Sequence, residues 1–226
     1  MEILEYLQKY NLYKQDMKII TANCKKEEYD AIPDQWKGLL NASTEAKLDI
    51  IIALWQAAVK DEMSLTIEYI REHFEDVLIV RIGTTYNLIY LIKSKKGKTL
   101  YYIGSCPVEP SDIPDDMPAS IKSFYTKLHN GFYDYCFKAM GLTEYKEVCS
   151  MPVWLEDLDP EDAEKYGVNS PSSANSYVFF ENGMGDCAAY NIISNEGVLF
   201  YSGEGLEYGK NFWNVVDTWI SIGLEG

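Results

Sequence analysis

Histidine is scarce in this sequence, and cysteine occurs in no pattern that would bind a metal. The 226 residues include two histidines and five cysteines. There is no Cys-x-x-Cys pair and no His-x-x-x-His spacing, so neither a zinc site nor a thioredoxin-like motif is expected. No serine stands in the Gly-x-Ser-x-Gly pattern of an activated nucleophile. We therefore expect no metal, no cofactor, reduced thiols and no standard nucleophile–base pair.

Long apolar runs are also absent. The longest, "IIIALW" at 50–55, falls far short of the roughly 18 residues that a membrane span requires. Glu2, Glu5 and Lys9 interrupt the first residues, where a secretory signal would be apolar. We expect a soluble, cytoplasmic protein without membrane contact.

Basic residues are scarce in the second half of the chain. Residues 1–100 hold 14 Lys+Arg and 15 Asp+Glu, whereas residues 101–226 hold 6 and 20, so the second half carries −14 of the net charge of −15. Such a field repels nucleic acid and anionic lipid and favours a basic partner. Acidic surfaces also serve simply to keep proteins soluble, and from charge alone that simpler interpretation is preferable.

Apolar periodicity divides the chain into helical and strand-like parts. The first 75 residues are predicted to be helical, with Ser43 and Ser64 preceding two amphipathic stripes. Runs over 77–83, 86–94 and 98–104 alternate as a strand meander does, and a Pro-led helix ending at Asn130-Gly131 and a short helix over 135–140 follow. A second meander and a closing helix over 212–220 complete the chain.

This separation of helices and strands predicts an α+β fold, because no βαβ alternation occurs. The expected architecture is an antiparallel twisted sheet of about six strands with flanking helices and an N-terminal helical extension. Residues 1–75 are expected to form the N-terminal helical region and residues 76–226 the α+β domain, with one compact unit as the alternative.

The stretch "FFENGMGDCAAYNI" at 179–192 holds the most suggestive polar residues. Asn182-Gly183 between two apolar runs is a strong hairpin signal. The stretch is not a phosphate loop, since no Lys follows and a strand comes next. Asp186 is expected to accept backbone N–H bonds in a turn. Paired with Glu204 it is also a low-weight candidate for a hydrolase acid and base.

Each histidine stands at the predicted end of a helix. There a partly protonated ring would interact favourably with the helix dipole. Capping is therefore the expected role of both His73 and His129.

Two segments resemble the SUKH superfamily, the family of the yeast cell-wall synthesis regulator. "MPASIKSFYTKLHNGF" resembles its Pro-led helix that closes at Asn-Gly, and "GMGDCAAYNI", followed by "GVLFYS", "EG" and "FWNVVDTWI", resembles its second half. The similarity covers residues 77–226 in element order. It implies structural roles for Asn130, Gly131, Gly185 and Asp186.

The bacterial members of that family are mostly immunity proteins that bind and neutralise a toxin, frequently a nuclease. The resemblance implies a non-catalytic protein with a surface for a cognate, basic toxin. The alternative implied by the yeast branch is a regulatory scaffold that binds several cellular partners.

Acidic side chains beside aromatic ones are the expected partner-binding residues. A nuclease must present a cationic surface to bind phosphate, and an acidic inhibitor can compete for that surface. The simpler interpretation is that both acidic segments are solvated loops. The expected contact residues are Glu109, Asp112, Asp115, Asp116, Trp154, Glu156, Asp157, Asp159, Glu161 and Asp162.

Overall fold

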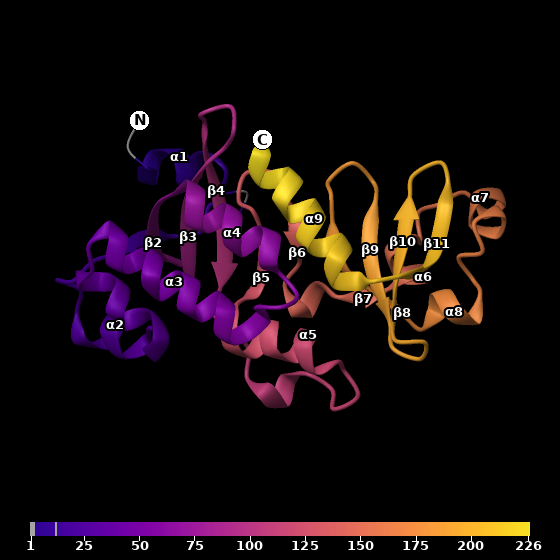
Figure 1. Ribbon diagram of the computed structural model, residues 1–226, viewed down its shortest axis with the longest axis horizontal. Coiled ribbons are helices and arrows are strands. Elements are labelled where there is room, and N and C mark those ends of the chain that lie inside the picture. The colour runs from indigo at the N-terminus through magenta and orange to yellow at the C-terminus, as the bar shows by residue number, and fades with distance from the viewer. Residues whose placement is uncertain (1–2, 12) are drawn as a thin grey trace.

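A computed structural model describes residues 3–11 and 13–226 and shows one antiparallel sheet that runs through the molecule (Figure 1). The strand order is β1-β2-β3-β4-β5-β6-β8-β9-β10-β11, and β7 pairs with β8 beside this path. The strands are β1 (Met17–Ile20), β2 (Phe74–Ile82), β3 (Thr85–Lys93), β4 (Thr99–Ser105), β5 (Asn130–Asp134), β6 (Ala139–Leu142), β7 (Cys149–Ser150), β8 (Ser176–Glu181), β9 (Cys187–Asn191), β10 (Glu196–Tyr201) and β11 (Gly205–Lys210).

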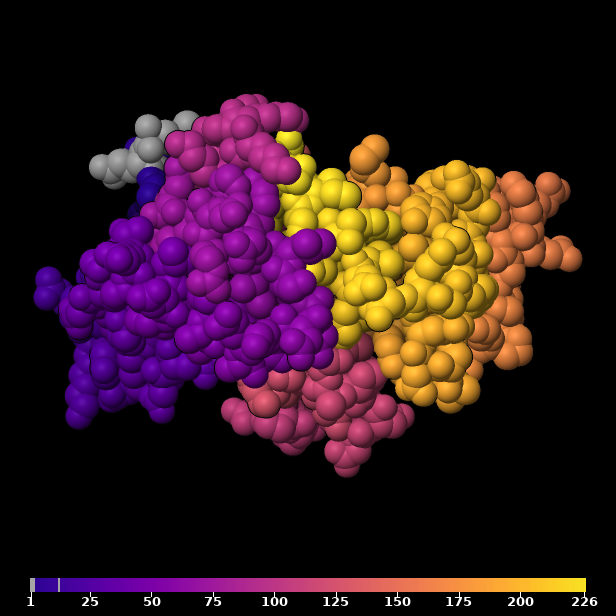
Figure 2. All heavy atoms as spheres, in the orientation of Figure 1, coloured from indigo at the N-terminus to yellow at the C-terminus, as the bar shows by residue number. Residues whose placement is uncertain are grey.

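Helices cover one face of the sheet along its length. They are α3 (Thr44–Val59), α4 (Ser64–His73), α5 (Ala119–Ser123) and α9 (Phe212–Glu225), and they pack on one large core. In the space-filling view the C-terminal segment, in yellow, lies between the first hundred residues and the orange segment near 175–205 (Figure 2).

The opposite face is covered at its two ends by separate helices. Helix α1 (Ile3–Lys9) packs over β1–β4, and α6 (Met151–Trp154), α7 (Pro160–Lys165) and α8 (Pro171–Ala174) lie at the β8–β10 end. These two groups form separate apolar cores, so the middle of this face stays open. The remaining elements are α2 (Lys26–Ala31), η1 (Asp34–Asn41), η2 (Pro110–Asp112), η3 (Phe124–Leu128) and η4 (Tyr145–Glu147).

Strand β3 shows why the central sequence is almost continuously apolar. Successive side chains of a strand point to opposite faces. Leu88, Tyr90 and Ile92 join the large core, whereas Ile89 and Leu91 join the core beneath α1. The strand is therefore buried on both faces.

Helices α3 and α4 begin in different ways. Ser43 caps α3 as predicted, because its side chain accepts a hydrogen bond from the backbone N–H of Ala46. The start of α4 is capped from another helix instead: the buried Asp217 of α9 accepts the backbone N–H groups of Leu65 at 2.9 Å and Thr66 at 2.8 Å. Ser64 is the first residue of α4 and makes no capping bond.

His129 lies in the main core and does not cap a helix with a charged ring, as the sequence had suggested. Its side chain is fully buried, and burial lowers its pKa to about 3. The indole N–H of Trp55 donates to the Tyr90 hydroxyl, which is 2.6 Å from Nε2 of His129. Because the indole can only donate, the Tyr90 proton is left for His129, and the imidazole is neutral.

The structure confirms the α+β class, both meanders, the closing helix and the turn at Asn182-Gly183, but it corrects three expectations. The sheet has eleven strands instead of about six. Residues 1–75 are not wholly helical, because Met17–Ile20 pairs with β2 as the edge strand. Residues 135–140 form a turn and the start of β6, since Asp134 accepts the backbone N–H groups of Cys136 and Phe137.

The first 75 residues share both the sheet and the main core with the rest of the chain. All five cysteines are free thiols. Within residues 3–11 and 13–226, no helix is long and apolar enough to cross a membrane.

Candidate functional site

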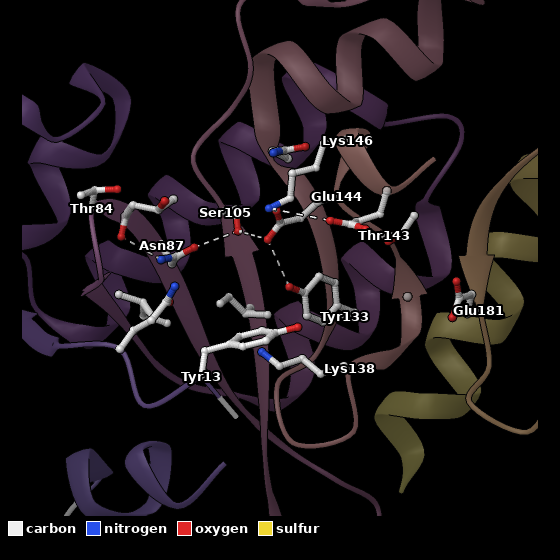
Figure 3. A pocket seen from close by; sticks show the side chains of 17 residues that line it. Tyr13, Thr84, Asn87, Ser105, Tyr133, Lys138, Thr143, Glu144, Lys146 and Glu181 are labelled. Atoms are coloured by element: carbon white, nitrogen blue, oxygen red, sulfur yellow. Dashed lines mark hydrogen bonds and ion pairs between the residues drawn. The ribbon is translucent and has the colours of Figure 1, made fainter. Parts of the chain in front are cut away.

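A hollow of about 670 Å³ opens on the sheet face that the helices leave uncovered (Figure 3). Its walls come from the loop before β1, the β2–β3 turn, strands β3 to β6, the segment after β6 and the end of β8. The lining side chains are mostly polar, and they include Tyr13, Gln15, Thr84, Thr85, Asn87, Ser105, Asn130, Tyr133, Lys138, Thr143, Glu144, Lys146, Glu147 and Glu181.

The floor of the hollow is a pair of buried polar side chains on neighbouring strands. Asn87 of β3 and Ser105 of β4 stand directly opposite each other in the sheet. The Ser105 hydroxyl donates to Oδ1 of Asn87 at 2.8 Å, and Nδ2 of Asn87 donates to the Thr85 carbonyl at 3.0 Å. Because each partner is neutral, the floor presents fixed dipoles rather than charge.

Glu144 lies at the centre of the hollow. Its Oε1 is 3.4 Å from both the Ser105 and the Tyr133 hydroxyl, and its Oε2 is 3.0 Å from Nζ of Lys146. The bond to Glu144 raises the pKa of Lys146, and burial raises that of Tyr133, so both stay protonated donors near neutral pH.

Two glycines and an asparagine bring Glu144 to this place. Gly131 has φ +86°, and a Cβ there would stand 2.9 Å from the Glu144 backbone nitrogen. A Cβ on Gly141 would meet the Phe132 carbonyl oxygen at 1.9 Å. Asn130 accepts the Tyr145 backbone N–H at 2.7 Å. Asn130 and Gly131 were predicted to close the Pro-led helix, but that helix ends at Leu128 and the two residues begin β5 instead. There they hold the segment that carries Glu144 against β5.

The rim combines charge with exposed apolar side chains. Glu181 accepts the indole N–H of Trp154 at 2.9 Å, and Nζ of Lys138 lies 4.5 Å from the Tyr135 ring centroid. Tyr13 on the rim is 81% exposed, and Phe137, which precedes the lining residue Lys138 in the chain but does not itself line the hollow, is equally exposed. Large side chains this exposed, around a concave site, are typical of protein interaction surfaces.

The Ser105 hydroxyl lies in the hollow, whereas neither histidine lines it. The Ser105 proton is directed to the neutral amide oxygen of Asn87 at 2.8 Å, and the Glu144 carboxylate is farther away at 3.4 Å. His129 is buried in the core with Tyr90, and His73 lies beside Tyr69. Among the described residues, no group of His, Cys, Asp and Glu side chains could hold a metal ion.

Comparison with family models, curated proteins and solved structures finds no match. The SUKH resemblance therefore remains a prediction that rests on the two sequence segments.

The two predicted acidic segments pack against opposite faces of the sheet. Ile113 and Met117, in the segment with Glu109 and Asp112, pack into the large core on the first face. Leu155, in the segment with Trp154, packs into the core beneath α6–α8 on the opposite face. Figure 1 shows the loop before α5 at the lower edge of the molecule and α7 at its right end. The two segments are therefore anchored in different apolar cores.

Most of these acidic side chains point to solvent. Glu109, Asp112, Asp115, Asp116, Glu156, Asp157, Asp159 and Glu161 are exposed, and Asp162 is half-buried. Asp159 also caps α7 by accepting the backbone N–H of Glu161. Of the ten expected contact residues, Trp154 alone is hydrogen-bonded to a side chain that lines the hollow. That side chain is Glu181.

Asp186 ties two turns together. It accepts the backbone N–H of Ser202 at 2.8 Å and an amide N–H of Asn182 at 2.7 Å. Gly185 supplies the φ of +95° that the turn requires. Both oxygens of Asp186 are thus engaged, Glu204 is exposed, and neither residue lines the hollow.

Of the residues that line the hollow, sequence reasoning named Asn130, as a structural residue, and missed Asn87, Ser105 and Glu144. Asn87 stands alone as a polar residue in "YNLIYLI", a signal that could have been followed. Glu144 has no such signal, because its position depends on two glycines and on strand pairings distant in the sequence.

Proposed function

We propose that this protein is a non-catalytic immunity protein of the SUKH type, which binds a cognate, cationic protein toxin and neutralises it. The proposal places the binding site at the hollow, with exposed side chains of the rim as additional contacts. It differs from the expectation based on the sequence, which placed the contact at the acidic loops.

The observation that carries this proposal is the concave, water-accessible hollow with the Glu144 carboxylate at its centre. Carboxylates outnumber ammonium groups among its lining residues, with Glu144, Glu147 and Glu181 against Lys138 and Lys146. A volume of about 670 Å³ accommodates a few side chains of a partner. Exposed apolar groups around a polar centre provide the contact area that affinity requires.

The excess acidic charge supports the same proposal. The second half of the chain carries −14. Complementary charge accelerates encounter with a cationic partner and makes association sensitive to salt. The acidic loops therefore contribute to the association rate, whereas the hollow provides the specific contacts.

The first test is to recover the partner from the native cells. Tagged protein is incubated with lysate at low and at high salt, and the bound proteins are identified. We expect one stoichiometric basic protein that is released as the salt concentration rises. Many substoichiometric partners would contradict the proposal in favour of a scaffold, and no partner at either salt concentration would contradict it altogether.

A further inference from the structure

Glu144 can accept more hydrogen bonds than it receives. The Ser105 hydroxyl has one proton, which is directed to Asn87 at 2.8 Å, so its contact with Oε1 of Glu144 at 3.4 Å is weak. The Tyr133 hydroxyl is equally distant at 3.4 Å. An ionised carboxylate has about four acceptor positions. Oε1 therefore lacks a strong donor.

Among residues 3–11 and 13–226, Lys146 supplies the one short contact to this carboxylate. Its Nζ lies 3.0 Å from Oε2 of Glu144 and 3.8 Å from Oε1 of Glu147. The Lys146 side chain is 70% exposed, whereas that of Glu144 is 23% exposed. In Figure 3 the Lys146 side chain extends toward Glu144 and ends beside its carboxylate. Lys146 can therefore move into solvent while Glu144 stays in place.

The shape of the site favours a guanidinium over an ammonium group. A guanidinium can donate two parallel N–H bonds to both oxygens of one carboxylate, which Lys146 does not do. It also stacks on aromatic faces. Tyr133 stands beside Glu144, and Tyr13 lies on the rim.

We propose that the hollow is a receptor for an arginine side chain of the partner, and that Lys146 occupies the cation position until that arginine displaces it. This inference rests on the proposed function and names the chemical group that the site recognises. Lys146 thereby competes with the ligand for the Glu144 carboxylate. Side chains that lack a guanidinium group do not displace it and therefore bind more weakly.

The proposal can be tested without knowing the partner. The probe is the blocked tripeptide acetyl-Gly-Arg-Gly-amide, titrated into ¹⁵N-labelled protein and followed by NMR. Its isosteric control is the citrulline peptide, and its anionic control is acetyl-Gly-Glu-Gly-amide. We expect the arginine peptide alone to shift the signals of Ser105, Tyr133 and Glu144, with a dissociation constant on the order of millimolar.

Three variants make the test specific. Lys146→Met removes the competitor, and the arginine peptide should bind up to about fivefold more tightly, the factor that corresponds to an exposed ion pair. Lys165→Met is the matched control, because it removes the same charge from α7, away from the hollow, and should leave binding unchanged. Glu144→Gln should weaken binding more than about tenfold.

Three results would overturn the inference: equal shifts with the arginine and citrulline peptides, equal effects of Lys146→Met and Lys165→Met, or preferential binding of the glutamate peptide. None of these depends on the cellular partner. A partner that binds at the hollow while the arginine peptide does not would remove this inference and leave the proposed function standing.

Discussion

The buried His129 predicts a specific loss of stability in acid. Its pKa is about 3 in the folded protein because burial disfavours the imidazolium, against roughly 6.5 in an unfolded chain. The folded state therefore binds fewer protons than the unfolded state between these values. Its stability is complete above pH 6.5 and falls as the pH drops toward 3.

The size of the loss follows from the pKa difference. Each pH unit well inside this interval costs about 1.36 kcal/mol, so the wild type loses about 2.7 kcal/mol from this group between pH 7.5 and pH 4.5. That is a large part of the roughly 5–15 kcal/mol that stabilises a typical domain.

His129→Phe isolates this contribution. Phenylalanine keeps a ring beside Phe132, whose centroid is 6.0 Å from that of His129, but it cannot take up a proton. Tyr90→Phe is the matched control, because it removes the hydrogen bond to His129 and leaves the titrating group in place. Each variant is expected to lose about 1–3 kcal/mol at pH 7.5.

The assay is urea unfolding followed by tryptophan fluorescence at four pH values from 7.5 to 4.5. The stability advantage of the wild type over His129→Phe should shrink by about 2.7 kcal/mol across this range, because all other groups titrate in both proteins. Tyr90→Phe should run parallel to the wild type. Parallel curves for the wild type and His129→Phe would refute the reasoning.

Two further substitutions test the packing. Asp217→Ala removes the cap that α9 provides for α4 and should cost about 1–3 kcal/mol in urea unfolding; an unchanged midpoint would show that the cap contributes nothing. Gly141→Ala forces a Cβ against the β5 backbone and should cost more than about 3 kcal/mol, whereas Gly38→Ala meets only the flexible end of Ile50. Equal costs for the two glycines would contradict the close approach of β5 and β6.

Local signals in the sequence predicted those elements whose structure is determined locally. Ser43 caps α3, and the alternating runs of β2 to β4 form a meander, because turn residues and apolar periodicity act over a few residues. The short strand β1 carried no such signal. Its four residues are held by pairing with β2, whose partner positions 79–82 lie far along the chain.

The errors have a common physical cause. Residues 135–140 resemble a short helix in composition, but the Asp134 carboxylate holds the chain in a turn, and Lys138 and Met140 both have positive φ. His129 stands at a helix end in the sequence, yet the helix directs its ring into the core toward Tyr90. In both cases a side-chain contact, rather than residue type, decides the outcome.

The hollow could not be predicted from the sequence, because it is the space left between two separate groups of helices on one sheet face. Its polar residues come from β3, β4, the segment after β6 and the end of β8. These elements are too far apart in the sequence for one short motif to include residues from two of them. The basic partner that the negative charge of the second half indicates stays a prediction.

The most direct test of the proposed binding site compares two matched charge reversals against the recovered partner. Glu147→Lys with Glu181→Lys changes the hollow, and Glu156→Lys with Asp157→Lys makes the same charge change in the acidic segment after α6. We predict that the first pair weakens binding more than tenfold, mainly through faster dissociation, while the second mainly slows association and lowers its salt dependence. Binding that survives the first pair and is lost with the second would contradict the placement of the site in the hollow.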